Sequence, residues 1–379
     1  MSHTSGPPFR ADHVGSLLRP PELLRAREKH RVGRISADEL RRVEDDAIRE
    51  AARMQAELGL QGVTDGEFRR GAWHMDFLYQ IGGVAKTDRT LRIQFKNEVG
   101  PVEAALGAFR IGGRLVLEKT IFAEDFAYLH SVAPAGTVAK LTIPSPSMLH
   151  YRGGRAVIDA AVYPDMDAFW RDLAEVYKQE IAGLAALGCT YLQLDDTSLA
   201  YLNDPTQRAY VTGIGGDGDK QHLINIRLIN RALAGKPEGM TVCIHMCRGN
   251  FRSSWVAEGG YDHVAEALFG ELAVDGFFLE YDDARSGGFA PLRFVPKGPK
   301  KVVLGLVTTK RAALEAKDEL KRRIEEAAKY VPLDQLCLSP QCGFSSTVDG
   351  NALTIEEEKA KLRLVVEVAR EVWGDGAVG

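Results

Sequence analysis

Cysteine is scarce in this sequence, and long hydrophobic runs are absent from it. The 379 residues include five cysteines, an odd number that argues against a disulfide framework and favours a reducing compartment. No stretch approaches the roughly 18 consecutive apolar residues that a membrane span needs. Residues 1–10 are polar and proline-rich, without the apolar core of a signal peptide. We therefore expect a soluble, cytoplasmic protein with no membrane partner.

A strong charge of either sign is also missing. Lysine and arginine together number 48, against 52 aspartates and glutamates, and the basic residues are scattered along the chain. Because nucleic-acid-binding proteins concentrate positive charge in a patch or stripe, this pattern argues against a nucleic-acid partner. A small-molecule partner is favoured, and nothing in the sequence indicates the oligomeric state.

Short apolar runs alternate with helical segments along the whole chain. This alternation is typical of a (β/α)8 TIM barrel, and a doubly wound open sheet is the alternative. Residues 91–118 alternate between apolar and polar side chains, and Gly112-Gly113 predicts the turn of a β-hairpin that departs from the barrel. We predict one barrel domain over residues 1–379, with strands at residues 9–16, 60–67, 138–144, 189–196, 241–247, 274–280, 301–307 and 336–341.

The apolar run at residues 241–247 ends in a His-X-Cys pair. In a strand, side chains alternate between the two faces, so Cys243, His245 and Cys247 share one face. An imidazole and a thiolate two residues apart suit a borderline-soft ion such as Zn²⁺ if other elements complete the site. We expect Cys243, one step deeper in the strand, to be a core residue, because a buried cysteine is most often a small hydrophobe.

Polar side chains lie at the carboxyl ends of several predicted strands. In a barrel these ends open on one face, where active sites are found, so we expect the side chains to converge. The alternative for Glu67 and Asp195 is a role as helix caps or solvated loop acids, and Ser16 is also suited to cap a helix. The residues at these ends are Ser16, Glu67, Asp195, His245, Cys247, Glu280 and Cys342.

This set of groups predicts the chemistry of a thiol. Two thiolates, one carboxylate and a neutral imidazole give a Zn²⁺ site a formal charge of −1, and the carboxylate is the ligand that an incoming thiolate displaces most readily. Zinc favours the deprotonated, nucleophilic form of a bound thiol, which an alkyl donor then alkylates. Glu67 and Asp195 are suited to hold a substrate ammonium, and Ser16 with neighbouring N–H groups a carboxylate. The sequence therefore predicts an amino-acid thiol as substrate.

At these residues the sequence resembles the catalytic, C-terminal domain of cobalamin-independent methionine synthase, in the same order and over nearly the whole chain. The resemblance implies a TIM barrel, a zinc ion held by His245, Cys247, Glu280 and Cys342, and homocysteine contacts from Ser16, Glu67 and Asp195. It also implies methyl transfer from methyltetrahydrofolate to homocysteine, giving methionine. The motifs that carry it are His245-Met246-Cys247, Glu280 after an apolar run, Ser339-Pro340-Gln341-Cys342-Gly343, Val14-Gly15-Ser16, Gly66-Glu67 and Gln193-Leu194-Asp195.

The methyl-donor side departs from the family pattern. The long enzymes have an additional N-terminal barrel that contributes to the folate site, and this sequence has no room for one. His150 stands where the family has a tryptophan that stacks on the pterin, and Lys310 stands where it has a histidine linked to proton transfer. The donor is therefore methyltetrahydrofolate or another methyl carrier. Two alternatives remain: a zinc-dependent alkyltransferase like those that join epoxyalkanes to coenzyme M, and a non-catalytic zinc-binding barrel.

Overall fold

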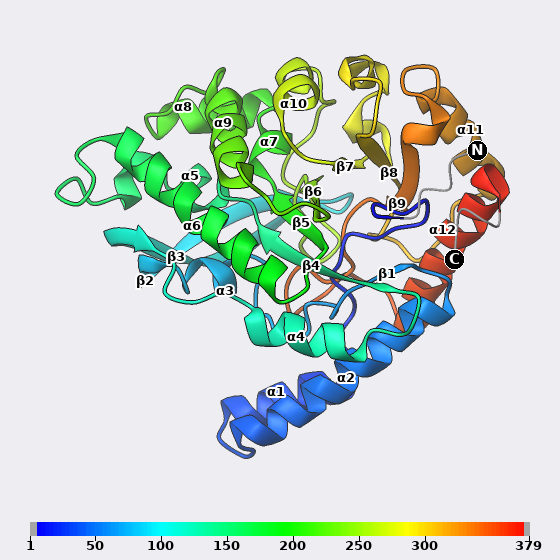
Figure 1. The fold of residues 1–379 in the computed structure, drawn as a ribbon, viewed down its shortest axis with the longest axis horizontal. Helices are drawn as coiled ribbons and strands as arrows, with labels where there is room; N and C mark the ends of the chain where they lie inside the picture. The colour runs from blue at the N-terminus through cyan, green and yellow to red at the C-terminus, as the bar shows by residue number, and fades with distance from the viewer. Residues whose placement is uncertain (1–5, 375–379) are drawn as a thin grey trace.

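The computed structural model describes residues 6–374 and shows a curled parallel sheet with helices around it (Figure 1). Within these residues the sheet has seven strands in the order β1-β4-β5-β6-β7-β8-β9. This arrangement confirms the predicted TIM-barrel-like α/β fold. The strands are β1 (Gly62–Val63), β4 (Val138–Pro144), β5 (Tyr191–Asp196), β6 (Thr241–Met246), β7 (Gly276–Glu280), β8 (Lys301–Val307) and β9 (Leu336–Pro340).

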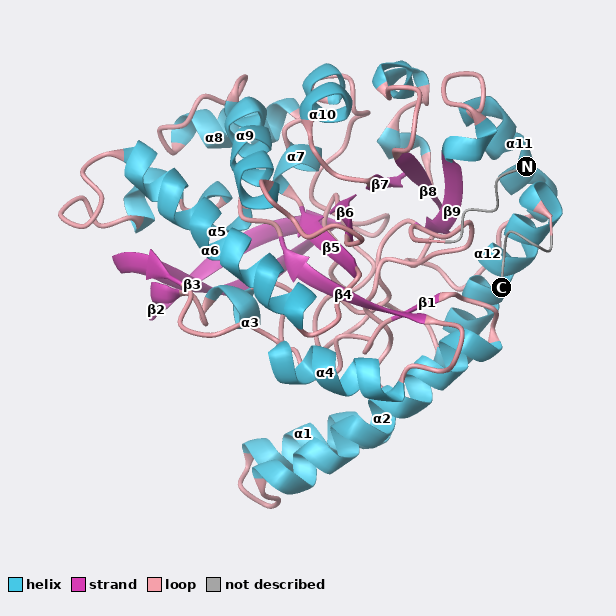
Figure 2. Cartoon of the chain, in the orientation of Figure 1, coloured by secondary structure: helices cyan, strands magenta, loops and turns pink. Residues whose placement is uncertain are grey.

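Helices pack on the outer face of the sheet (Figure 2). The long helix α6, for example, buries the apolar stripe formed by Phe169, Leu173 and Ile181. None of the helices in residues 6–374 has the length and apolar character needed to cross a bilayer. The α-helices are α1 (Pro21–Arg31), α2 (Ala37–Glu57), α3 (Met75–Leu78), α4 (Ala123–Val132), α5 (Met148–Tyr151), α6 (Met166–Ala186), α7 (Ser198–Tyr201), α8 (Pro205–Gly213), α9 (Gln221–Leu233), α10 (Ala265–Glu271), α11 (Lys317–Ala327) and α12 (Ile355–Trp373).

The strand predicted at residues 9–16 is an extended segment with a single bridge, between Ala11 and Leu338 of β9. The Asp12 carboxylate accepts hydrogen bonds from the backbone N–H groups of Phe9 and His13, at 3.1 and 2.8 Å. These local bonds compete with a regular strand ladder. The segment still lies between β9 and β1, because the Thr64 hydroxyl donates to the Gly15 carbonyl at 2.6 Å.

The predicted hairpin is present, but its turn lies elsewhere. Strands β2 (Gly82–Lys96) and β3 (Pro101–Val116) pair antiparallel, and the turn between them is closed by Asn97, whose side-chain oxygen accepts from the Gly100 N–H at 3.1 Å. The prediction of a turn at Gly112-Gly113 is wrong. Gly113 instead lies against Gly83 at a register shift, where a Cβ on Gly83 would meet the Gly113 carbonyl at 2.6 Å.

A small apolar core fills the inside of the curled sheet. Cys243 belongs to it, which confirms its assignment as a core residue; its neighbours there include Tyr191 and Phe278. An ion pair is buried beside this core: the Lys140 ammonium lies 3.1 Å from the Asp12 carboxylate and 4.1 Å from the centre of the Phe278 ring, with both charged side chains fully buried.

We expect Lys140→Met to lower the free energy of unfolding by about 3 to 5 kcal/mol, because it leaves the Asp12 carboxylate buried without its cation. Guanidinium denaturation followed by circular dichroism measures this. The exposed pair Arg322–Glu319 provides the control, since Arg322→Met should change stability by no more than about 1 kcal/mol. Equal effects of the two substitutions would contradict a stabilising role for the buried pair.

Candidate active site

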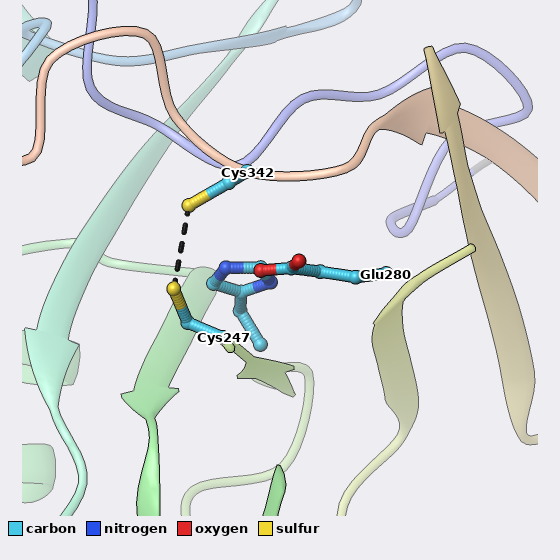
Figure 3. Close-up of side chains that lie close together, drawn as sticks. Cys247, Glu280 and Cys342 are labelled. Carbon is cyan, nitrogen blue, oxygen red and sulfur yellow. Dashed lines mark hydrogen bonds between the residues drawn. The ribbon is translucent and has the colours of Figure 1, made fainter. Parts of the chain in front are cut away.

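The carboxyl ends of three strands of the sheet, β6, β7 and β9, deliver four potential metal ligands to one point. His245 lies near the end of β6 and Cys247 just beyond it, Glu280 is the last residue of β7, and Cys342 follows β9 by two residues. All four side chains are buried, and one ligand atom from each lies within 4.8 Å of the others. Figure 3 shows Cys247 and Cys342 with their sulfurs facing each other and the Glu280 carboxylate directed toward the same space. The curl of the parallel sheet brings together Cys247 and Cys342, which are 95 positions apart in the sequence.

The hydrogen bonds around these side chains leave ligand atoms without partners. Among residues 6–374, neither ring nitrogen of His245 has a hydrogen-bond partner, and the same holds for one carboxylate oxygen of Glu280. The other Glu280 oxygen accepts from the Arg248 N–H at 2.9 Å. Buried polar atoms are nearly always paired, so partnerless atoms that face two thiols indicate that a further group belongs between them. One imidazole, two thiols and one carboxylate fit a tetrahedral Zn²⁺ ion.

The two cysteines share a hydrogen bond, with 3.5 Å between their sulfurs. This bond, helped by the His245 ring, holds the pKa of Cys342 well below that of an ordinary thiol. The same bond raises the pKa of Cys247 well above its usual value. One sulfur is therefore already disposed to be a thiolate, the form that binds a metal.

Positive charge surrounds the Glu280 carboxylate. Arg285 lies 3.6 Å from it, and the buried Lys310 ammonium also acts on it electrostatically. Burial raises the pKa of Glu280, and the positive charge of Lys310 opposes that rise. The nitrogen of Lys310 has no hydrogen-bond partner among the described residues. Lys310 thus places a positive charge beside the four-ligand cluster.

The residues predicted to hold the substrate line the same cavity as the four-ligand cluster. Ser16, Glu67 and Asp195 are buried in its wall, and none of them caps a helix, so the alternative of capping roles does not apply. Ser16 accepts from the Ser345 N–H at 3.3 Å and packs so closely on Gly343 that a Cβ there would lie 2.0 Å from its hydroxyl.

The two acids act on each other. Burial, and then the nearby charge of Glu67, raise the pKa of Asp195 to about 7. Burial likewise raises the pKa of Glu67, although Arg70 lies 3.7 Å from its carboxylate and the Thr142 hydroxyl donates to it at 2.9 Å. Two buried carboxylates with raised pKa values, both facing a cavity, are suited to bind a cation.

The hairpin supplies a second wall of the cavity, which the sequence did not indicate. Its side chains Leu91, Ile93, Phe95 and Phe109 line the cavity, which has a volume of about 130 Å³. Backbone hydrogen bonds between Lys96 and Trp255 fasten the hairpin over the strand ends. His150, in contrast, packs on Trp170 and does not line this cavity. Its ring is therefore not available to stack on a ligand in the cavity.

Sequence and structure comparisons agree with this geometry. Residues 9–371 match the family described as cobalamin-independent synthase, catalytic domain. The chain belongs to the cobalamin-independent methionine synthase family. It is 47% identical over 97% of its length to YxjG, an uncharacterised protein of Bacillus subtilis, 95% of which is covered. It is 24% identical to methionine synthase of Pyrococcus abyssi, over 87% of this chain and 85% of that one.

A solved structure is similar over the whole fold. The chain is 41% identical to a candidate vitamin-B12-independent methionine synthase from Listeria monocytogenes, covering 97% of this chain and 99% of the other with a TM-score of 0.78. The family resemblance predicted from six short motifs is therefore confirmed, as is the class of activity that the methionine synthase family carries, methyl transfer.

Proposed function

We propose that this protein is a zinc-dependent methyltransferase that converts homocysteine to methionine. One observation carries the proposal: a buried cluster of His245, Cys247, Glu280 and Cys342 opens into a cavity that also holds Glu67 and Asp195. The four-ligand cluster is suited to bind a thiol through a metal ion, and the two acids are suited to bind an ammonium group. Homocysteine carries both groups on one small molecule.

The four clustered side chains would hold the zinc ion. A bound zinc ion lowers the pKa of a thiol that reaches it and so supplies a nucleophilic sulfur at neutral pH. Glu280 is the ligand best placed to give way, since Arg285 and Lys310 offer its carboxylate alternative positive partners. The methyl donor is methyltetrahydrofolate or another methyl carrier.

The other side chains would orient the amino acid. Glu67 and Asp195 hold the ammonium, while Ser16 and adjacent N–H groups hold the carboxylate. A sulfonated thiol such as coenzyme M has no ammonium group, and its sulfonate would bring a further negative charge into a cavity that already holds two buried carboxylates, which is unfavourable. A purely structural zinc site would not require acids on other strands. Both observations favour the homocysteine methyltransferase over its alternatives.

Replacing zinc with Co²⁺ makes the coordination visible by absorption spectroscopy. We expect homocysteine to strengthen the thiolate-to-cobalt charge-transfer band, because a third sulfur joins the metal. Homoserine, which has a hydroxyl instead of the thiol, is the control and should not strengthen this band. If homocysteine leaves the spectrum of the fully loaded protein unchanged, the proposed function is wrong.

A further inference from the structure

The cavity extends beyond the thiol site toward the hairpin, and this outer part has a different character. Rings and aliphatic chains form it, including Trp73, Phe95, Phe109 and Phe251. Two pairs of these rings are in contact: Trp73 lies 4.4 Å from the His74 ring, and Phe95 lies 5.4 Å from Phe251. We call this part of the cavity the aromatic wall. It borders the same cavity as Cys247 and Cys342, where a methyl donor must approach.

One charged side chain lies at the aromatic wall, and it is a cation. Arg152 lines the cavity, with its guanidinium carbon 5.0 Å from the centre of the Tyr201 ring. Among residues 6–374, no carboxylate lies within ion-pairing distance of its guanidinium, which packs on the rings of Tyr151 and Tyr201 and donates no hydrogen bond. A half-buried guanidinium that is fixed on a ring and lacks an anion is a ready partner for a carboxylate.

His74 adds an unpaired polar atom beside the arginine. The side chain is 8% exposed, lines the cavity, and its Nδ1 has no hydrogen-bond partner among the described residues. Burial, and then the charge of Arg152, lower the pKa of His74 to about 3, so the ring is neutral at physiological pH. It is suited to hydrogen bond with a ligand and unsuited to protonate one.

Methyl donors differ in whether their leaving group must take up a proton. A neutral N-methyl donor needs a proton on its nitrogen before the nitrogen can leave. Glu67 and Asp195 are the carboxylic acids of the cavity lining in residues 6–374, and in the proposed function the substrate ammonium keeps them ionised. A donor whose methyl group sits on a positively charged sulfur or nitrogen leaves as a neutral molecule and needs no proton.

We propose that the methyl donor is a small acid that carries its methyl group on a sulfonium or quaternary ammonium centre. Arg152 binds its carboxylate, and the aromatic wall binds the cationic centre through cation–π contacts. This inference rests on the proposed function and specifies its second substrate.

The reaction balances without a further reactant. The homocysteine thiol gives up its proton, and its sulfur then forms a bond to the methyl carbon. The bond from that carbon to the onium sulfur or nitrogen breaks, and its electron pair stays on the leaving atom. Homocysteine and the onium acid therefore give methionine, one neutral sulfide or amine group and one proton.

Binding is tested by calorimetry on the zinc-loaded protein with three probes. Glycine betaine has both groups, 3,3-dimethylbutanoate has the same shape and acid without the positive charge, and tetramethylammonium has only the charge. We expect glycine betaine to bind at least about tenfold more tightly than either of the others. Equal affinity of glycine betaine and 3,3-dimethylbutanoate, or no binding of glycine betaine, would overturn the proposal.

Variants locate the site. Arg152→Gln should weaken glycine betaine binding about tenfold or more and Arg152→Lys should restore part of it. Arg155→Gln should leave it unchanged, because Arg155 lies outside the cavity lining and bonds the Tyr163 carbonyl. In all three variants the cobalt spectrum should still respond to homocysteine, which shows that they are folded. An unchanged affinity in Arg152→Gln would exclude this arginine as the anion partner.

Turnover separates this inference from the proposed function. Zinc-loaded protein, homocysteine and dimethylsulfonioacetate should give methionine, detected by mass spectrometry, whereas methyltetrahydrofolate should give none. Methionine from methyltetrahydrofolate but not from dimethylsulfonioacetate would overturn the inference and leave the homocysteine methyltransferase intact. Failure of the cobalt spectrum to respond to homocysteine would instead remove the proposed function itself.

Discussion

Cys342→Ser should abolish zinc binding and methyl transfer together. The substitution removes one of the two sulfurs of the four-ligand cluster and the partner with which Cys247 shares its hydrogen bond. Loss of a mere outer partner of a zinc ligand already weakens binding about 10- to 100-fold, so loss of a thiolate ligand should weaken it by more than about 100-fold. Competition with a chromophoric chelator measures the zinc affinity, and methionine formation measures the activity.

Cys337→Ser provides the matched control for this prediction. Cys337 lies five positions earlier, on β9 itself, is equally buried, and belongs to the apolar core rather than to the four-ligand cluster. The Cys337→Ser variant should be less stable than the parent protein and keep its zinc. If both variants bind zinc as the parent protein does, or both lose it, then Cys342 has no special role as a ligand.

Much of the fold was predictable because buried parallel strands leave a simple signature. The apolar runs near residues 241–247 and 301–307 coincide with β6 and β8, since both faces of such strands are covered. Residues 9–16 do not form the regular strand that was predicted, because the Asp12 carboxylate accepts hydrogen bonds from backbone N–H groups that a strand would use. The predicted position of the hairpin turn, at Gly112-Gly113, was wrong because glycines also occur where two backbones approach each other closely.

The site was predictable to the extent that it depends on strand ends. The barrel rule brings the ends of β6, β7 and β9 together, so the four potential ligands could be named although they are distant in sequence. No such rule predicts the residues of the aromatic wall. Arg152 lies in the loop after α5, and Phe95 reaches the cavity because of the pairing register of the β2-β3 hairpin. Neither position follows from a periodic pattern in the sequence.

Asp195→Asn should weaken the binding of homocysteine about 100-fold and leave the zinc content unchanged. Removing one partner of a buried charge pair costs about 2 to 5 kcal/mol, and about 1.4 kcal/mol corresponds to a tenfold change in affinity. Asp195 pairs in register with His245 on the neighbouring strand but offers no atom to the four-ligand cluster. Calorimetry measures the affinity and a chelator assay the zinc content.

The control for this substitution lies one residue further along β5. Asp196 is equally buried, but its carboxylate accepts hydrogen bonds from Ser145, Ser147 and Ser198 and does not line the cavity. Asp196→Asn should lower stability and keep the affinity of the folded protein for homocysteine. Equal loss of affinity in both variants would mean that the effect comes from disturbance of the strand.

Methionine isolates the ammonium contact, because it has the same ammonium group but no thiol. The pKa of Asp195 is raised to about 7, first by burial and then by the charge of Glu67, and only the ionised carboxylate attracts an ammonium. The ionised fraction therefore rises with pH, and methionine should bind more tightly at pH 8 than at pH 6. Since asparagine does not titrate, this increase should shrink in Asp195→Asn. If that variant kept both the parent affinity for methionine and its full pH dependence, the ammonium would have to bind elsewhere in the cavity.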